Sequence, residues 1–384
     1  WPSWRWLLFS IASRRNLAGD CKNTGKVDTV SEIKIAIKNL YKIFGSNPIA
    51  GVEHVKNGIS KQELLDGHGH VLALSDVHID IPARRIQVIM GLSGSGKSTL
   101  IRHINRLIEP TSGEIIIDDD NVLEMNATEL REFRRFKASM VFQRFALLPH
   151  RTIANNVAYG LTIQEVAEEE ASERSKKWIN RVGLAGFENH YPAQLSGGMQ
   201  QRVGLARALA TNAEILLMDE AFSALDPLIR TDMQDVLLGL QEELHKTIVF
   251  ITHDLDEALR IGDSIAILRD GAIVQKGSPQ DIILHPVNDY VADFTKDINR
   301  GRVLKVASIM DSEQTQTGST DSMVIPKIEQ NMVIEDALQV LSAAGDSAAI
   351  VTHDAKTVGS VDRDKMIAAL ARPNLGKGRI GTYR

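Results

Sequence analysis

Two spacings of hydrophobic residues alternate along most of the chain. Short runs that are apolar at nearly every position predict strands buried on both faces, at Ile86–Met90, Ala138–Phe142, Ala213–Met218, Thr247–Ile251 and Ser264–Leu268. Between them, apolar residues recur every three or four positions, which predicts helices at Leu100–Leu107, Met199–Leu209, Leu228–Leu244 and Leu255–Ile261. This alternation predicts an α/β fold with a mostly parallel sheet flanked by helices on both faces.

A different kind of strand precedes this pattern. Polar and apolar residues alternate one by one at Glu32–Lys38 and Val71–Ile81, which is the period of a half-buried strand and predicts an added antiparallel sheet. A polar insertion, Asn47–Gly69, separates the two strands, with one helical turn expected at Lys61–Leu65. Near the other end of the pattern, Asp270-Gly271 predicts a tight hairpin.

The C-terminal part of the chain predicts a small second module. A polar, small-residue stretch at Asp311–Ser322 predicts a linker, and an α+β pattern of about 45 residues, near the lower limit for independent folding, follows it. We therefore expect a main domain at residues 31–300, with a helical subdomain at about 144–212. A linker at 301–323, the module at 324–372 and a disordered tail at 373–384 would follow it.

Composition describes a globular protein without a bulk attraction to nucleic acid. The 384 residues are 43% hydrophobic and 24% charged, and 44 basic against 49 acidic residues give a net charge of −5. A single cysteine, Cys21, excludes an intramolecular disulfide and a zinc–cysteine cluster. The apolar runs fall short of the roughly 18 residues needed to cross a bilayer, so other subunits would have to cross any membrane.

The first residues have an unusual composition. Residues 1–19, WPSWRWLLFSIASRRNLAG, hold no acidic residue and do not begin with Met. They are either a short signal or transit-like segment, or an upstream stretch that takes no part in the fold. Because nothing after them has the character of an exported protein, we expect residues 1–30 to form an extension outside the fold.

The most informative stretch is Gly91–Thr99, GLSGSGKST, which matches the phosphate-binding loop G-x-x-x-x-G-K-[ST] between a predicted strand and a predicted helix. Its glycines, Gly91, Gly94 and Gly96, let backbone N–H groups turn toward phosphate oxygens. Lys97 supplies a charge for the β- and γ-phosphates, and the Ser98 hydroxyl can ligate Mg²⁺. We expect this loop, with Ser93, Ser95 and Thr99, to bind ATP and Mg²⁺.

Two acidic residues, Asp219 and Glu220, end the apolar run Ile215–Met218. Ligands of parallel sheets bind outside the carboxyl ends of the strands, so Asp219 should lie beside the phosphates and hold Mg²⁺ directly or through water. Glu220 can then accept a proton from an attacking water molecule. Such acid pairs are common, so this pair alone would be a weak indication of a metal site and a base. The phosphate-binding loop earlier in the sequence strengthens it.

A second glycine-rich turn, LSGGMQQR at Leu195–Arg202, opens another predicted helix. Its exposed N–H groups would form a second anion site, which one nucleotide does not need in addition to its own loop. We therefore expect Ser196, Gly197 and Gly198 to grip the γ-phosphate bound by a second copy of the chain. The alternative is a flexible loop in which Ser196 only caps the helix.

Taken in order, GLSGSGKST, LSGGMQQR, ILLMDE, SALD (Ser223–Asp226) and THD (Thr252–Asp254) resemble the ATP-binding-cassette (ABC) ATPases, from about Ile33 to Arg300. The resemblance implies a P-loop NTPase core with a helical signature subdomain, working as a head-to-tail dimer. It also implies individual roles. Phe44 would be the aromatic residue that stacks on the base, and Gln143 the glutamine that senses Mg²⁺ and water. Glu220 would be the catalytic base, His253 the switch histidine at the γ-phosphate and Asp226 the aspartate at the dimer contact. From the residues alone, Tyr41 or Phe44 could stack on a base or pack in a core.

Longer stretches look like the glycine betaine/proline/choline importer branch of these ATPases. They are EAFSALDPLIRTDMQ (Glu220–Gln234), VFQRFALLPH (Val141–His150), DLDEALRIGD (Asp254–Asp263) and the polar insertion. The likeness implies a bacterial subunit at the cytoplasmic face of the inner membrane that powers quaternary-amine uptake for osmoprotection. Its partners would be a permease, with a coupling-helix groove around Phe145–Thr152, and a substrate-binding protein.

The C-terminal module resembles one cystathionine-β-synthase (CBS) repeat, from Asp336–Leu338 through Val358–Val361. Members of the branch often carry two repeats, which pair. A single repeat leaves two readings open, a sensor of a ligand or of ionic strength and a remnant that serves only in dimerisation.

Two other functions fit the nucleotide motifs. A soluble ABC ATPase acting on nucleic acid or the ribosome would carry basic patches, coiled-coil insertions or tandem cassettes, which the net charge of −5 and the single motif set argue against. A regulatory ATP-binding protein without turnover would not need both Glu220 and His253.

Overall fold

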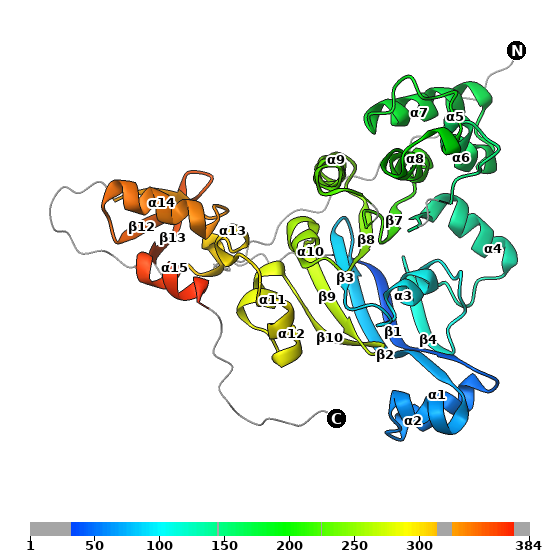
Figure 1. Ribbon diagram of the computed structural model, residues 1–384, viewed down its shortest axis with the longest axis horizontal. Helices are drawn as coiled ribbons and strands as arrows, with labels where there is room; N and C mark the ends of the chain where they lie inside the picture. The colour runs from blue at the N-terminus through cyan, green and yellow to red at the C-terminus, as the bar shows by residue number, and fades with distance from the viewer. Residues whose placement is uncertain (1–31, 144–145, 224, 313–324, 372–384) are drawn as a thin grey trace, which may run out of the picture. The chain divides into compact units, whose positions relative to one another are not determined.

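A six-stranded sheet forms the centre of the computed structural model, which describes residues 32–143, 146–223, 225–312 and 325–371 (Figure 1). The strand order is β10-β9-β3-β8-β7-β6, for strands bounded by β3 Ile86–Met90, β6 Ala138–Val141, β7 Ile215–Asp219, β8 Thr247–Thr252, β9 Ser264–Arg269 and β10 Ala272–Gly277. All neighbours are parallel except β10, which pairs antiparallel with β9. The predicted parallel sheet and the Asp270-Gly271 hairpin are both confirmed.

Alternate residues of the central strands face two separate cores. Val88 and Met90 of β3 belong to one core, whereas Ile89 between them belongs to the other. Burial on both faces explains why these strands read as continuous apolar runs. The first core takes residues from α8 (Gly197–Ala210), α9 (Pro227–Leu244) and α10 (Leu255–Ile261), and the second takes residues from α3 (Lys97–Ile104).

The predicted antiparallel sheet is also present and supplies many residues of the second core. Its order is β2-β1-β4-β5, for β1 Ile33–Phe44, β2 Val71–Pro82, β4 Ser112–Ile117 and β5 Asp120–Asn121. Inward-facing residues such as Ile35 and Ile37 are fully buried. Strand β1 continues to Phe44 through register shifts after Ile37, where Asn39 takes a left-handed φ of 48°. The polar–apolar alternation is lost there because a bulge changes which residues face inward.

The polar insertion contains two helices, more structure than the single turn expected from the sequence. They are α1 (Pro48–Lys56) and α2 (Lys61–His68), which pack Val52 and Leu64 onto Tyr41, Ile43 and Leu72. The side chain of Asn47 caps α1, and Ser60 and Glu63 form a reciprocal capping box on α2. With so few buried residues, the caps do much to define where these helices begin.

A mainly helical region lies between β6 and β7. It contains α5 (Ile153–Val157), α6 (Tyr159–Ile163) and α7 (Glu168–Arg181), preceded in the chain by α4 (Ala127–Glu132) and a π-helical turn at Phe133–Lys137. Figure 1 shows α5, α6 and α7 grouped around α8. The predicted helical subdomain is therefore built on the helix that carries the second glycine-rich turn.

The C-terminal residues form the expected small α+β module. After α11 (Pro279–Leu284), α12 (Asp289–Phe294), α13 (Arg300–Val303) and a 3₁₀ turn at Val306–Ser308, its elements are β11 Lys327–Glu329, α14 Ile334–Ala344, β12 Ala348–His353, β13 Lys356–Asp362 and α15 Arg363–Leu370. The Ile334 amide donates to Leu304 O at 2.9 Å, so the start of the predicted linker 301–323 is part of the packing. The likeness of this module to a CBS repeat stays a prediction. The N-terminal extension, 1–30, and the tail, 373–384, lie outside the described residues.

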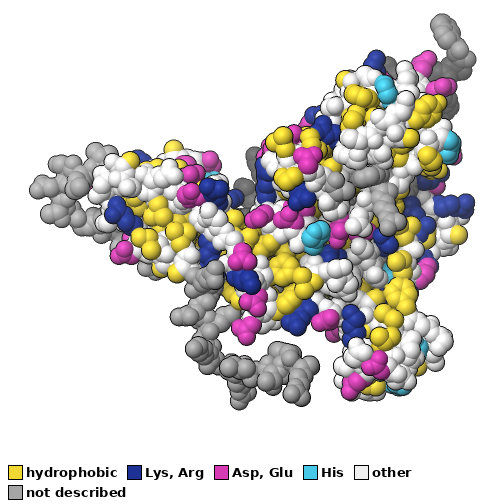
Figure 2. All heavy atoms as spheres, in the orientation of Figure 1, with side chains coloured by type: hydrophobic (Ala, Val, Ile, Leu, Met, Phe, Trp, Pro, Cys, Tyr) yellow, Lys and Arg dark blue, Asp and Glu magenta, His cyan; other side chains and the backbone are white. Residues whose placement is uncertain are grey.

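Charged side chains of both signs are interspersed over the face of the molecule shown in Figure 2, without a continuous basic surface. This agrees with the nearly balanced count of 44 basic and 49 acidic residues.

Candidate active site

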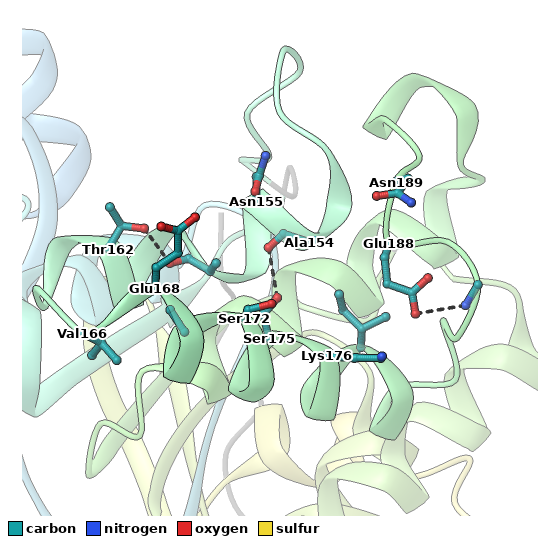
Figure 3. Close-up of a pocket in the computed structure, with 14 residues that line it drawn as sticks. Ala154, Asn155, Thr162, Val166, Glu168, Ser172, Ser175, Lys176, Glu188 and Asn189 are labelled. Atoms are coloured by element: carbon teal, nitrogen blue, oxygen red, sulfur yellow. Dashed lines mark hydrogen bonds between the residues drawn. The ribbon is translucent and has the colours of Figure 1, made fainter.

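The phosphate-binding loop lines a cavity of about 360 Å³ at the carboxyl ends of the central strands. Gln143 and Glu220, which follow β6 and β7, line it on one side, and Phe44 at the end of β1 lines it on another. A larger cavity of about 880 Å³ lies in the helical region, between α5–α6 and α7, and none of the loop residues lines it (Figure 3). The cavity at the strand ends is the smaller of the two, but it is the one lined by the predicted nucleotide-binding side chains, among them Lys97, Ser98 and Glu220.

The loop itself is shaped by two close backbone approaches. A Cβ on Gly91 would lie 2.1 Å from Leu268 O of β9, and one on Gly96, whose φ is 105°, would lie 2.5 Å from Ala73 O of β2. Only glycine fits at these two points, so the chain can turn tightly from β3 into α3. Of the remaining loop residues, Ser93, Gly94, Ser98 and Thr99 line the cavity, and Ser95 is buried and does not line it.

Lys97 is the first residue of α3 and is 5% exposed. Its Nζ donates to Gly91 O at 2.8 Å and to Leu92 O at 3.0 Å, and it lies 4.0 Å from Glu220 Oε1. Burial lowers the pKa of this ammonium group, while the nearby carboxylates of Glu220 and Asp219 oppose the shift. The contacts of the Lys97 ammonium group are therefore two backbone carbonyls and a distant carboxylate. Replacing these contacts by phosphate oxygens would cost little free energy.

Asp219 is fully buried at the end of β7 and is held by two side chains of α3. Ser98 Oγ donates to Asp219 Oδ1 at 2.8 Å, and Arg102 Nη2 donates to Asp219 Oδ2 at 3.0 Å. Arg102 is not part of any motif singled out in the sequence. Its spacing of four residues from Ser98 puts both on one face of α3, and this was the available signal.

Glu220 joins three strand ends. Its Oε2 accepts a hydrogen bond from Gln143 Nε2 at 2.8 Å, and its Oε1 lies 3.7 Å from Nδ1 of His253, which follows β8. Glu220 has a left-handed φ of 46°, an uncommon conformation for a residue with a side chain that recurs at functional sites. The structure thus brings together Lys97, Gln143, Glu220 and His253, which the sequence places up to 156 residues apart (253 − 97).

The second glycine-rich turn lies elsewhere in the same chain. Ser196 caps α8 by accepting a hydrogen bond from the Met199 amide at 3.3 Å, and Ser196 and Gly197 are exposed. Neither they nor Gly198 line the cavity of the phosphate-binding loop. Asp226 is also exposed and caps α9 through the Ile229 amide at 3.1 Å. Both expected dimer-contact sites are thus accessible helix starts.

The two candidate aromatic residues differ in their surroundings. Tyr41 is buried in the core of the insertion, whereas Phe44 is 44% exposed and lines the cavity. Lys42 Nζ lies 4.7 Å from the Phe44 ring centroid. Four further cavity residues were not identified as site residues from the sequence: Lys61 of the insertion, and Val71, Leu72 and Ala73 of β2.

The donor set beside the loop suits Mg²⁺ better than a metal bound entirely by protein. The oxygens of Ser98, Asp219 and Gln143 are the hard ligands that Mg²⁺ prefers. Within the described ranges, no cluster of three His, Cys, Asp or Glu side chains could hold a metal ion. An ion held by these oxygens would take its other ligands from phosphates and water.

Comparison with known proteins relates these motifs to one family. The family model described as "ABC transporter" matches residues 74–223. The glycine betaine transport ATP-binding protein OpuAA of Bacillus subtilis is 49% identical over 330 residues, which cover 86% of this chain and 79% of that protein. The glycine betaine/proline betaine transport system ATP-binding protein ProV of Escherichia coli is 52% identical over 277 residues, 72% of this chain and 69% of that one.

Solved structures agree with the fold. The dimeric ATP-binding cassette MJ0796, in a post-hydrolysis state bound to ADP and Pi, matches with a TM-score of 0.56 and 34% identity over 64% of this chain and 98% of its own. Among the helices that the structure describes here, none has both the length and the apolar character to cross a membrane.

Proposed function

This chain belongs to the ABC transporter family of ATP-binding proteins, and we propose that it hydrolyses ATP to energise uptake of an osmoprotectant such as glycine betaine, proline betaine, choline or proline. The observation that carries the proposal is the arrangement of Lys97, Gln143 and His253 around Glu220, on a chain about half identical to betaine transport subunits. A separate permease crosses the membrane, and a substrate-binding protein delivers the solute to it. The chain works at the cytoplasmic face of the bacterial inner membrane, held there by the permease.

In this proposal Glu220 is the general base. Its carboxylate is fixed at Oε2 by the 2.8 Å hydrogen bond from Gln143, and its Oε1 lies 3.7 Å from Nδ1 of His253. Lys97 leaves the carbonyls of Gly91 and Leu92 to bind the β- and γ-phosphates, and His253 contacts the γ-phosphate. Phe44 stacks on the base. Each group is then positioned by the end of a different strand or by the loop between β3 and α3.

Ser98, Asp219 and Gln143 are the residues that would hold Mg²⁺. When bound with the nucleotide, the ion neutralises charge that develops on the phosphates. Ser98 Oγ lies 2.8 Å from Asp219 Oδ1, so two of the proposed ligand groups are already next to each other before the ion binds. Arg102 holds the second oxygen of this buried carboxylate in place through its hydrogen bond at 3.0 Å.

A second copy completes each site. Ser196, Gly197 and Gly198 are exposed or partly exposed and away from their own loop, so they are available to the γ-phosphate bound by a partner, with Asp226 at the contact between the copies. ATP binding would close this head-to-tail dimer and hydrolysis would release it.

The permease contact belongs on the helical region. The stretch first expected to form the groove, Phe145–Thr152, includes residue 145, which lies outside the described residues, and Thr152 caps α5. The cavity of about 880 Å³ begins just beyond it, with apolar walls that include Ala154, Val166 and Ile179. Figure 3 shows Glu168, Glu188 and Lys176 projecting around it. We propose that a short amphipathic helix of the permease docks here, with basic residues toward the two glutamates.

An uptake assay tests the function. Deletion of the gene should abolish accumulation of radiolabelled glycine betaine at high osmolarity, and the parent gene should restore it. The Lys97→Ala variant should not restore uptake, since it removes the loop's charge for the phosphates. Normal uptake in the deletion strain, or uptake restored by Lys97→Ala, would contradict the proposal.

A further inference from the structure

Lys61 is a cation at the edge of the nucleotide cavity that none of the roles above uses. It is the first residue of α2, in the insertion, and it lines the cavity together with Phe44, Ser93 and Gly94. Its side chain is 41% exposed, and its only close charged partner among the described residues is Asp270, whose Oδ1 lies 3.9 Å from Nζ. The insertion thus contributes a charged group to the cavity.

The helix itself gives no reason for a lysine at this position. The N-terminal end of a helix carries partial positive charge, so a cation in the first turn is unfavourable. Ser60 and Glu63 already cap α2, with Glu63 accepting from the Ser60 amide at 2.9 Å. A local preference that is broken without a structural gain points to a functional reason.

The pair with Asp270 does not explain Lys61 either. Both side chains are exposed, at 41% and 69%, and exposed pairs at such distances contribute little to stability. Asp270 has a second cation, Arg269, whose Nε lies 3.5 Å from its Oδ2. Asp270 therefore stays paired if Lys61 moves away.

The hairpin tip fixes Asp270 beside the phosphate-binding loop. The amide of the next residue, Gly271, donates to Ser95 O at 3.0 Å, and Gly271 O accepts from the Ser75 amide at 2.9 Å. Asp270 thus lies next to the loop, with its Oδ1 3.9 Å from the ammonium group of Lys61, which lines the cavity.

We propose that Lys61 is a nucleotide-binding residue, whose ammonium group moves from Asp270 to the phosphate oxygens of the bound nucleoside triphosphate. The proposal rests on the nucleotide site of the proposed function and adds a residue from the insertion to it. A phosphate chain, with several negative charges, attracts an ammonium group more strongly than one exposed carboxylate does. The insertion then forms an outer wall of the nucleotide site, and Asp270 competes with the nucleotide for Lys61.

Nucleotide titration of matched variants tests this role. Lys61→Met keeps the length of the side chain and removes its charge, so it should weaken binding of MgATP, measured by calorimetry at low ionic strength, about threefold to tenfold. Asp270→Asn should tighten binding in the parent and have no effect in the Lys61→Met background. The matched control is Lys56→Met, in which a cation of α1 that lies 5.4 Å from the Tyr41 ring loses the same charge away from the cavity.

Two outcomes separate this proposal from the one it rests on. If Lys97→Ala abolishes MgATP binding while Lys61→Met binds as tightly as Lys56→Met, the nucleotide site stands and the role of Lys61 is wrong. If Lys97→Ala also binds normally, the nucleotide site itself is wrong. Melting curves of each variant show whether the fold is retained. Acetylation of Lys61 by acetic anhydride is an independent readout, because MgATP should protect Lys61 if the nucleotide binds there. Absence of protection would contradict the proposal.

Discussion

Asp219 and Glu220 are neighbours in sequence but have different surroundings. Asp219 is fully buried between Ser98 and Arg102, whereas Glu220 is 16% exposed and turned by its left-handed φ of 46° toward Gln143 and His253. A conformation of this kind costs about 1–3 kcal/mol and persists where the surroundings impose it. The backbone at one residue thus gives the two carboxylates different surroundings, which suits the metal-binding and proton-accepting roles that we propose for them.

His103 gives a prediction about pH. It is fully buried on α3, its Nδ1 lies 2.6 Å from Ile108 O, and burial lowers its pKa from 6.5 to about 4, with Lys42 adding to the shift and Ile108 O and Glu109 opposing it. The folded protein keeps the ring neutral while the unfolded chain protonates it below about pH 6.5. Stability from this group is therefore present above pH 6.5 and lost as the pH falls toward 4, by up to about 3 kcal/mol.

Urea unfolding at pH 7, 5.5 and 4.5 measures this loss. His103→Phe should lower stability at pH 7, because Ile108 O loses its partner, but should flatten the decline toward acid pH. His150→Gln, at an exposed histidine, should follow the parent curve. A decline in His103→Phe as steep as that of the parent would contradict the assignment.

At the scale of elements, the sequence predicted those that a strong periodicity marks. The central strands were readable because burial on both faces makes them apolar throughout, and α8, α9 and α10 because they carry wide apolar stripes. Helices α1 and α2 were not, since each is short and buries few residues, Val52 and Leu64 among them. The Asn47 and Ser60 caps were the readable signals for them.

The exit of β3 gives a prediction about local structure. In Gly91→Ala the new Cβ would meet Leu268 O at 2.1 Å, and the pairing of β3 with β9 prevents the backbones from separating. We expect a loss of roughly 2–4 kcal/mol, typical of severe overlap in a packed core. Gly94→Ala is the matched variant, because its φ is 77° but nothing lies within 4 Å of the new Cβ. It should cost about 1–2 kcal/mol of strain only. Equal melting temperatures for the two variants would refute this account.

At the scale of the whole molecule, the sequence motifs named groups that the structure brings close together, but not how these groups meet. The loop positions followed from spacing, whereas the contacts of Glu220 with Gln143 and His253 depend on the order of strands β6, β7, β8 and β3. The place of Lys61 at the cavity could not be predicted either, because it depends on how the insertion packs. A single chain also leaves Ser196 away from the loop that it is proposed to serve.

Mixing two inactive variants tests the assembly. Lys97→Ala removes the loop charge and Ser196→Arg blocks the second glycine-rich turn, so each variant alone should lack ATPase activity. In a head-to-tail dimer, one Lys97→Ala chain and one Ser196→Arg chain build one intact site, and the mixture should regain part of the parent rate. If the mixture stays as inactive as each variant alone, the two motifs act within one chain.

Glu220 is proposed to accept the proton from water while other groups hold the nucleotide. The most direct measurement is turnover and gel filtration of Glu220→Gln with MgATP. Glutamine keeps the size and polarity of the side chain but cannot act as the base, so hydrolysis should fall by about 10² to 10⁴-fold. Binding should survive, and the uncleaved γ-phosphate should hold the chain as a dimer on the column. Hydrolysis at the parent rate would contradict the account, because the base would then lie elsewhere.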